Sequence, residues 1–546
     1  MIAHQLRSIC VAVAAATLTF GVSPHPTAAE STPGSTAKEF LVTRPPFNAA
    51  PRNGREKRDY VRQERNTRAI NKAIAQAHEA GGGIVRISQS GGRTIYDISQ
   101  IRMLSNVTLH IDDDVVLLAS SWWRDYRSLP PEDVNNKDPR VTNDPDTWPP
   151  LNNRGPQHWS FYYSVISAVD CENIAVTGGG VINGNRSRVP SDEDVQADGF
   201  HVMQAIRSEI TGFQPEEPRG IRRGAHLINF QRCRNIRIGS FDKPGDSMSR
   251  LRLTHSGNYT IYINYCDKAQ IRGVEIHGGW DGIHSRYGQN VAISDVSITN
   301  NLDDGIAGHH TYRWLVQRLT VDGGYYPADL AQISDDPSLD EKREEAARGI
   351  SQGNGWRFGG VDLIAKDIRI RDKRQAAIHH FADGDFPKPE SMPYHIDPQG
   401  YASHNWRLSN WQIDNCRHAL FYQYNGLWQD AGPVGSVAMA DFKGTNMLAT
   451  PIVWFNKDAP KNGLLILKDC RFNPSEQVER LNPGFGMYVS NIKSVRLLGR
   501  NEFNYLPKHS QNGSPPAPPV VVENAEQTYG TNPYAGSPQS RQVQPK

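Results

Sequence analysis

Three aspartates in the middle of the chain are placed so that they could support acid/base chemistry. Asp281 and Asp304 lie 23 residues apart, each is followed by Gly-Ile, and Asp303 directly precedes Asp304. Carboxylates held a few ångströms apart repel one another, and this repulsion raises the pKa of at least one of them. A protonated carboxylic acid beside an ionised carboxylate is the pair that hydrolysis of a glycosidic bond requires.

The segment around these acids repeats itself. Val274, Val296 and Leu319 begin similar apolar alternations at spacings of 22 and 23 residues, with turns rich in Asn and Gly between them. Self-similarity at this period is typical of a coiled parallel sheet in which each turn stacks on the previous one. Stacked strands lie roughly 4.8 Å apart, so residues at equivalent positions form ladders. The repeat therefore predicts that Asp281 lies beside Asp304, with Asp303 adjoining both.

The same alternation predicts which way the side chains point. A buried unpaired carboxylate is costly, so we expect Ile283 and Ile306 to face inward and the acids to face an outward groove. Gly282 and Gly305 would bend the chain to allow this. Two other interpretations stay open, because Asp before Gly is an ordinary turn former and a group of carboxylates can bind calcium.

The rest of the chain predicts an all-β fold, a parallel β-helix over residues 58–506 with an N-terminal capping helix. Residues 65–80 have apolar residues at helical spacing, and Gly81-Gly82-Gly83 ends the pattern. A helix there would cover the open end of the solenoid, which would otherwise template aggregation. Residues 30–57 predict a flexible leader, and residues 507–546, rich in Pro, Gly and Ser, predict a disordered tail.

The first 29 residues have the pattern of an export signal. Arg7 precedes an apolar run over residues 9–22, and small residues ending at Ala29 suit a cleavage site. The apolar run is too short and too broken to span a bilayer. We therefore expect a secreted or periplasmic protein without a membrane span.

Composition narrows the partners. The chain has 60 basic and 58 acidic residues, a net charge of +2, which does not indicate binding to nucleic acid or an anionic membrane. Five cysteines remain after the signal, and three of them, Cys171, Cys233 and Cys266, precede similar strand starts. Without a Cys-x-x-Cys motif, they predict a buried ladder of small side chains. Neither a cofactor nor a metal is expected.

On these motifs the chain resembles glycoside hydrolase family 28, the polygalacturonase family of right-handed parallel β-helices in the pectin lyase-like superfamily, over roughly residues 60–380. Gly279-Trp280-Asp281-Gly282-Ile283 is similar to that family's Asn-Thr-Asp-Gly-Ile, and Leu302-Asp303-Asp304-Gly305-Ile306-Ala307 to its Gly-Asp-Asp-Cys-Ile-Ala. His255-Ser256-Gly257 stands where the family has Asn-Ser-Pro. The resemblance implies an inverting hydrolysis carried by Asp281, Asp303 and Asp304.

The departures from the family pattern concern the groups that recognise substrate. The family's Gly-His-Gly is matched by Ala347-Arg348-Gly349, so that Arg348 replaces the histidine. Its Arg-Ile-Lys falls near Ile378-His379-His380, where no Arg-x-Lys is present, and the pair His309-His310 has no counterpart. We therefore expect a polysaccharide or oligosaccharide other than plain polygalacturonate. The expected substrate contacts are Trp280, His309, His310, Arg348, His379 and His380.

Two other functions remain open on the sequence. A polysaccharide lyase or uronate epimerase on the same β-helix would need a base and a cation that neutralises the uronate, for which Arg348 and the histidines are candidates. A non-catalytic carbohydrate-binding β-helix would use the acids as turn residues or calcium ligands. The sequence alone leaves the sugar, the linkage, the assignment of acid and base, and the oligomeric state open.

Overall fold

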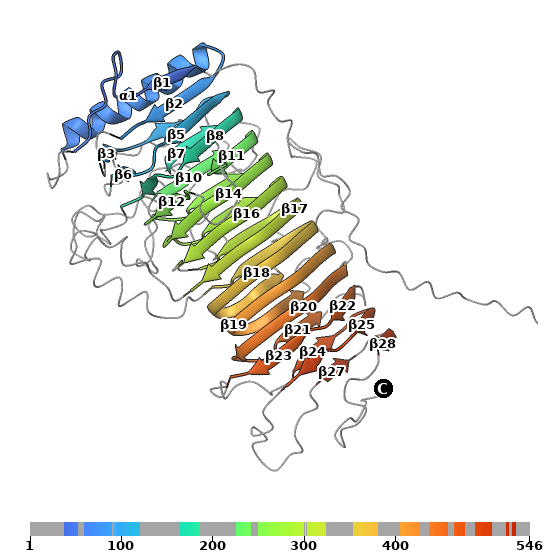
Figure 1. Ribbon diagram of the computed structural model, residues 1–546. Helices are drawn as coiled ribbons and strands as arrows, with labels where there is room; N and C mark the ends of the chain where they lie inside the picture. Colours follow the sequence, from blue (N-terminus) through green and yellow to red (C-terminus); the bar gives the residue numbers. More distant parts are fainter. Residues whose placement is uncertain are drawn as a thin grey trace, which may run out of the picture. The chain divides into compact units, whose positions relative to one another are not determined.

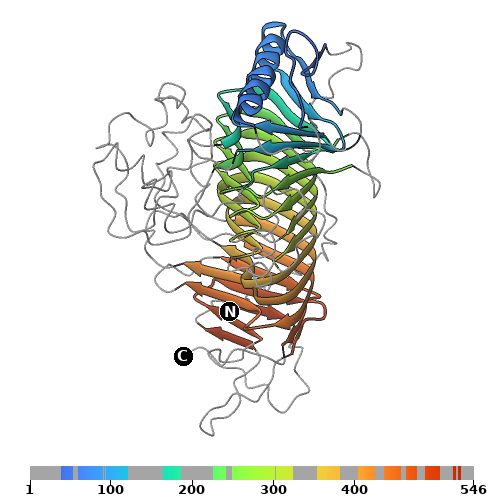
Figure 2. The ribbon, with the colours of Figure 1, turned by 90° about the vertical axis from the view of Figure 1, so that its left-hand side faces the viewer.

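The computed structural model describes residues 38–52, 59–89, 92, 94–120, 164–185, 225–241, 249–299, 301, 303–323, 353–380, 404–424, 436–456, 463–475, 486–504, 520–523 and 527–530. These residues form a parallel β-helix whose coils follow one another from α1 to β28 (Figure 1). Every strand pairing among them is parallel. In the second view the strands wind around a common interior (Figure 2).

The elements follow in chain order. They are β1 (Glu39–Leu41), α1 (Tyr60–Glu79), β2 (Gly83–Ile87), β3 (Thr94–Ile98), β4 (Ile101–Arg102), β5 (Val107–Ile111), β6 (Val115–Ala119), β7 (Ser164–Val169), β8 (Glu172–Gly178), β9 (Val181–Asn183), β10 (His226–Gln231), β11 (Arg234–Gly239), β12 (Leu251–Thr254), β13 (Ile261–Asn264), β14 (Asp267–His277), β15 (Ile283–Arg286), β16 (Gln289–Thr299), β17 (Ile306–Asp322), β18 (Trp356–His380), β19 (His404–Tyr424), β20 (Ser436–Met447), β21 (Ile452–Asn456), β22 (Leu464–Lys468), β23 (Arg471–Pro474), β24 (Met487–Ser490), β25 (Ser494–Leu498), β26 (Glu502–Phe503), β27 (Val520–Glu523) and β28 (Gln527–Gly530).

The predicted repeat is confirmed by the strand register. Val274 of β14 lies opposite Val296 of β16, which in turn lies opposite Leu319 of β17. A second interior ladder runs through Ile283 and Ile306, both fully buried. The isoleucines therefore face the core, as expected, because alternate residues of each strand point to opposite sides of the sheet.

The corners between strands are stabilised by ladders of asparagine. Asn106, Asn173 and Asn235 adopt positive φ values of 66°, 54° and 55°. The Asn173 amide donates to Asn106 Oδ1 at 2.8 Å, and the Asn235 amide donates to Asn173 Oδ1 at 2.9 Å. Asparagine tolerates the left-handed conformation better than most residues, so the same sharp corner can recur on every coil.

The predicted capping helix is confirmed, although α1 begins earlier than expected. Asp59 accepts a hydrogen bond from the Val61 amide and so satisfies the first turn. The buried face of the helix consists mainly of small and branched apolar side chains, among them Ala69, Ile70 and Ala73, and it packs on strands β2 to β5. The apolar end of the stack is thereby covered.

The predicted boundaries of the solenoid are too narrow at both ends. Residues 30–57 are not a leader throughout, because β1 pairs with β2 and Arg52 forms an ion pair with the buried Asp97. Residues 507–546 are not a disordered tail throughout, because β27 and β28 add to β24 and β25. In both places main-chain hydrogen bonds to an existing strand outweigh a polar, Pro-rich composition. The predicted signal, residues 1–29, lies outside the described residues.

The predicted cysteine ladder agrees with the structure. All five cysteines outside the predicted signal are buried and carry free thiols. Cys171, Cys233 and Cys266 follow one another on successive coils, and burial raises the pKa of Cys233 well above its usual range. Such thiols pack as small apolar groups. Among the described residues, no helix has the length and apolarity to cross a membrane.

Candidate active site

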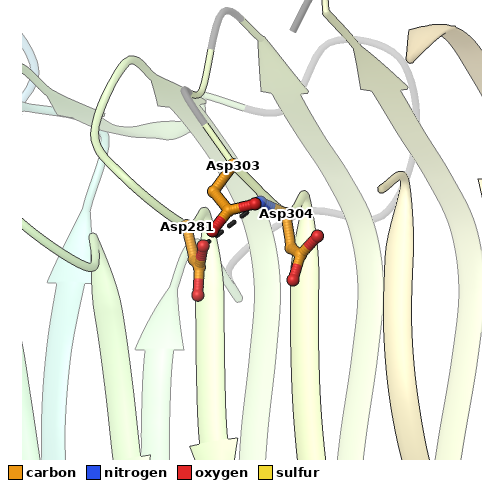
Figure 3. A group of neighbouring side chains, drawn as sticks. All are labelled: Asp281, Asp303 and Asp304. Carbon is orange, nitrogen blue, oxygen red and sulfur yellow. Dashed lines mark hydrogen bonds between the residues drawn. The ribbon is translucent and has the colours of Figure 1, made fainter. Parts of the chain in front are cut away.

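The three predicted acids meet on two neighbouring coils (Figure 3). Asp281 lies between β14 and β15, and Asp303 and Asp304 lie between β16 and β17. One carboxylate oxygen from each of the three lies within 4.8 Å of the others. This is the only such group of acids, histidines or cysteines in the described part of the chain. The ladder predicted from the repeat therefore brings the acids together.

Two glycines allow the coils to approach this closely. A Cβ atom on Gly282 would lie 2.6 Å from the Gly305 carbonyl oxygen, and one on Gly305 would lie 2.5 Å from the Gly355 carbonyl oxygen. Neither glycine has a positive φ. Glycine is required at both positions because a larger side chain would not fit. The special backbone conformation that the expected bend implied is not present.

Both oxygens of Asp281 accept hydrogen bonds. The Asp304 main-chain amide donates to Oδ1 at 3.1 Å, and His284 Nδ1 lies 2.7 Å from Oδ2. Burial, with the charges of neighbouring His309 and Arg286, lowers the pKa of His284 well below its usual range. This shift favours the neutral imidazole, which carries its proton on Nδ1 when it donates to the carboxylate. Two donors on one carboxylate favour its ionised form.

Opposing influences act on the carboxyl group of Asp304. Burial raises the pKa of this group, and the charge of Asp281 raises it further, against the charge of Arg357 and the hydrogen bonds from Asn354, which lower it; the net shift is upward. Oδ1 accepts hydrogen bonds from the Asn354 main-chain amide at 2.8 Å and from its side-chain amide at 2.9 Å. Oδ2 lies 3.6 Å from Arg357 Nη1. Since Oδ1 already accepts two donors, a proton on this group belongs on Oδ2.

Asp303 is more accessible to solvent than its two neighbours. Its Oδ2 accepts a hydrogen bond of 3.0 Å from Trp280 Nε1. Trp280 in turn packs against Tyr259 and Tyr262, a small cluster separate from the interior core. The aromatic cluster and this partly buried carboxylate thus adjoin one another on the outside of the coil.

A buried lysine lies beneath the acids, and sequence reasoning missed it. Lys373 is fully buried, and its Nζ donates to Asn301 Oδ1 at 3.0 Å and to the Asp303 carbonyl oxygen at 2.9 Å. Burial lowers the pKa of Lys373 to about 8, although the three nearby carboxylates oppose this shift. In sequence it stands within a charged Asp-Lys-Arg run that reads as solvent-exposed, so no signal marked it.

The acids are less open to solvent than expected. Asp281 is 3% exposed and Asp304 is 1% exposed, which contradicts the prediction of both on an open outward groove. They do point away from the isoleucine core, but rings cover that side of the coil. His284 stacks on Tyr259 at 4.0 Å between ring centroids and on His309 at 5.2 Å. Hydrogen bonds to the carboxylates offset the cost of this burial.

The predicted substrate contacts separate into three groups. Trp280 and His309 lie at the acids as expected, and His379, half-buried, lies on the outward side of β18. His380, the next residue, points inward, where it stacks on Tyr422 at 3.9 Å within the core, so its prediction as a sugar contact is wrong. Strand alternation places the two histidines on opposite faces. The side chain of His310 and the whole of Arg348 lie outside the described residues.

Arg348 stays a prediction, but the described residues show which residue is stacked on Asp304. The residue stacked directly on Asp304 is Asn354, since the Gly305 amide donates to the Asn354 carbonyl oxygen and Ile306 lies opposite Trp356. Gly353-Asn354-Gly355 therefore lies next to the acid pair. The sequence comparison did not single out Asn354, because Gly353-Asn354-Gly355 has an asparagine where the family motif has a histidine.

Comparison with known proteins supports the fold. Residues 226–330 match a family model described as a right-handed β-helix region. No curated protein matches the sequence significantly. Among solved structures, the family 28 exopolygalacturonase of Yersinia enterocolitica is 13% identical, with 91% of this chain and 78% of that chain covered and a TM-score of 0.53.

Two further structures match less well. The hyperthermoactive exopolygalacturonase of Thermotoga maritima is 14% identical over 90% of this chain and 88% of that one, with a TM-score of 0.36. A mutant tailspike protein of E. coli bacteriophage HK620, in complex with a pentasaccharide, is 10% identical over 86% and 64%, with a TM-score of 0.35. The family-model match and the likeness to the Yersinia enterocolitica structure support the predicted right-handed parallel β-helix.

Proposed function

We propose that this protein is an exported glycoside hydrolase that cleaves a polysaccharide or oligosaccharide with Asp281, Asp303 and Asp304. The observation that carries the proposal is the pair formed by Asp281, whose carboxylate is held by two N–H donors, and Asp304, whose pKa burial raises. Environments that separate the pKa values of two adjoining carboxyl groups are how glycosidases obtain an acid and a base on one site.

Asp304 is the general acid in this proposal. It carries the proton on Oδ2 and gives it to the glycosidic oxygen as the bond to the leaving sugar breaks. Arg357, whose Nη1 lies 3.6 Å from Asp304 Oδ2, then stabilises the carboxylate that Asp304 becomes. Asn354 fixes the other oxygen with two hydrogen bonds and so sets the direction of the proton.

Asp281 is the general base, and Asp303 helps to place the attacking water. Asp281 stays ionised beside its two donors and takes the proton from water as the oxygen attacks the anomeric carbon. Asp303, the more exposed of the three acids, lies next to Trp280, whose ring supplies a face on which a sugar can stack. Lys373 adds positive charge beneath a site that would otherwise hold several negative charges.

The same three carboxylates have the chemistry of a ligand set for a hard cation such as calcium. The hydrogen bonds already made by Asp281 and Asp304 occupy three of their four oxygens with N–H donors, which leaves them poorly suited to coordinate an ion. The ammonium of Lys373 also supplies positive charge on the inner side. Hydrolysis therefore accounts for the arrangement better than ion binding does.

A screen of plant, algal and bacterial polysaccharides for new reducing ends tests the proposal. Hydrolysis is expected to release reducing ends without a change in ultraviolet absorbance. An unsaturated, ultraviolet-absorbing product would instead identify a lyase. Binding without any product across the panel would identify a carbohydrate-binding protein. Export is tested separately, by the cell fraction in which the protein accumulates and by the residue at its mature N-terminus, expected near Glu30.

A further inference from the structure

His284 occupies a special position on the outward side of β15. It follows Asp281 by three residues and lies in a ladder between Tyr262 of the preceding coil and Ala307 of the next. Its ring is stacked on Tyr259, with an angle of 11° between the planes, and only 3% of its surface is exposed. The stacking fixes the plane of the ring, so both nitrogens have defined directions.

The two nitrogens have different surroundings. Nδ1 is tied to Asp281 Oδ2, whereas Nε2 is buried and makes no hydrogen bond within the described structure. A neutral imidazole that donates from Nδ1 has a lone pair on Nε2, which makes that atom an acceptor. A buried acceptor without a donor is unfavourable, and such exceptions in folded proteins call for an explanation.

The outward ladder changes side-chain size beside this histidine. The residue after His284 in the outward ladder is Ala307, the smallest side chain in it, and Arg357 follows on the next coil. In this ladder the small side chain of Ala307 stands between the large side chains of His284 and Arg357. Arg357 also contacts Asp304.

We propose that His284 is a positioning residue that holds Asp281 through Nδ1 and accepts, through Nε2, a hydrogen bond from a hydroxyl group of the sugar bound at the acids. The inference rests on the proposed hydrolase function and deepens it. A hydroxyl donor supplies the hydrogen bond that Nε2 lacks, and the same imidazole then joins recognition of the sugar to the orientation of the base. Asp281, Tyr259, Tyr262 and His309 contact the ring, and the charges of His226, Arg286 and Arg357 act on it.

The protonation pattern can be measured on the wild-type protein without a substrate. Nitrogen-15 NMR of histidine-labelled protein should show a neutral ring protonated on Nδ1 and bare on Nε2, with the signals assigned by their loss in His284→Phe. Adding the oligosaccharides released from the cleaved polysaccharide should move the Nε2 signal in the direction of a hydrogen-bond acceptor. An Nε2–H tautomer, an imidazolium, or an Nε2 signal that the sugar leaves unchanged would overturn the proposal.

Kinetics provide the second test. His284→Phe keeps a flat ring against Tyr259 but removes both hydrogen bonds, so kcat/KM should fall roughly 10- to 100-fold, the loss expected for a hydrogen bond to a charged group. Asp281 loses a donor to its ionised form, so the acid limb of the pH profile should also move to higher pH. An unchanged acid limb would mean that the ring only packs, and would overturn the role assigned to it.

His380→Phe is the matched control. His380 is also 3% exposed and stacked on a tyrosine, but it lies in the interior core away from the acids. This variant should change thermal stability and leave the pH profile in place. A wild-type protein that cleaves no polysaccharide yet shows the Nδ1–H tautomer would overturn the hydrolase function and the sugar contact, while the link between His284 and Asp281 would stand.

Discussion

The main-chain amide of Asp304 donates a 3.1 Å hydrogen bond to the carboxylate of Asp281. The contact joins the two acids across neighbouring coils through an atom that no side-chain substitution removes. Replacing the Asp304 side chain therefore leaves the donor to Asp281 in place. An asparagine at 304 keeps an oxygen for both donors of Asn354. An asparagine at 281 keeps an oxygen for the Asp304 amide, and its NH2 group can donate to His284 Nδ1 if that ring takes its other tautomer. Amide variants of both acids should consequently fold.

We expect Asp281→Asn and Asp304→Asn each to reduce kcat by about 10²- to 10⁴-fold, because each removes one partner of the acid/base pair. Steady-state kinetics on the polysaccharide that the wild type cleaves measures the loss. Asp295→Asn is the matched control, since the half-buried Asp295 of β16 pairs with the exposed Arg318 of β17 and this variant should retain full activity. Normal turnover in both active-site variants would end the assignment.

Arg357→Gln should move the alkaline limb of the pH profile to higher pH. Arg357 favours the ionised form of Asp304, so its removal raises the pKa of that carboxyl group further. The general acid then stays protonated, and active, at a higher pH than in the wild type. Arg369→Gln, on the same strand but bonded to Gln412 at the surface, should leave the limb where it is. A limb that moves downward or stays fixed in Arg357→Gln would contradict Asp304 as the acid.

Asp304→Asn should make the protein more stable at neutral pH. The folded state raises the pKa of Asp304 above its unfolded value, so the wild type is most stable below that unfolded value and loses stability as pH rises through the folded pKa. The uncharged amide avoids this loss. The advantage in melting temperature should be clear at pH 7 and should disappear at a pH well below 4. A lower melting temperature than the wild type at pH 7 would count against the raised pKa.

Lys373 should produce the opposite pH dependence. Its pKa is lowered to about 8 in the folded protein, from 10.5, so the unfolded chain binds the proton more tightly between these two values. Stability therefore rises with pH through this window, by up to about 3 kcal/mol for the full shift. Denaturant unfolding of wild type and Lys373→Met across the window should show the gain in the wild type alone. Parallel curves would indicate an unperturbed lysine.

The product should have inverted configuration at the anomeric carbon. The resemblance to family 28 implies inversion, and the two N–H donors on Asp281 reduce its strength as a direct nucleophile. The carboxylate oxygens lie within 4.8 Å of one another. Retaining enzymes have carboxyl separations of about 5–5.5 Å and most inverting enzymes have larger ones, so the spacing by itself favours retention and the stereochemistry tests the resemblance directly. Proton NMR of the first product formed distinguishes the anomers, and retention would make Asp281 the nucleophile instead.

The parts of the fold that recur were predictable from the sequence. The 22- to 23-residue spacing predicts the stacking of Val274 on Val296 and the meeting of the three acids, because equivalent residues of a repeat must form ladders. The helical spacing before the glycines likewise predicts the cap. Each of these signals is local in the chain or regular in its period.

The parts that were missed depend on contacts without a period. Asn354 and Lys373 reach the acids from 50 and 70 residues away in sequence, a distance that the repeat does not predict. The inward direction of His380 depends on the phase of alternation in a strand that contains a register shift between Lys373 and Ala376. The strands β1, β27 and β28 form because a neighbouring strand offers hydrogen bonds, which their composition does not reveal.

The jump from 23 to 50 residues between stacked neighbours has an evolutionary consequence. Asp281 and Asp304 are one repeat apart, whereas Asp304 and Asn354 are separated by far more chain and still meet in register. The polypeptide between them can therefore lengthen, shorten or be exchanged without shifting either anchor. Homologous proteins could therefore differ in that stretch, and in the glycan they bind, while keeping the contacts among Asp281, Asp304 and Asn354.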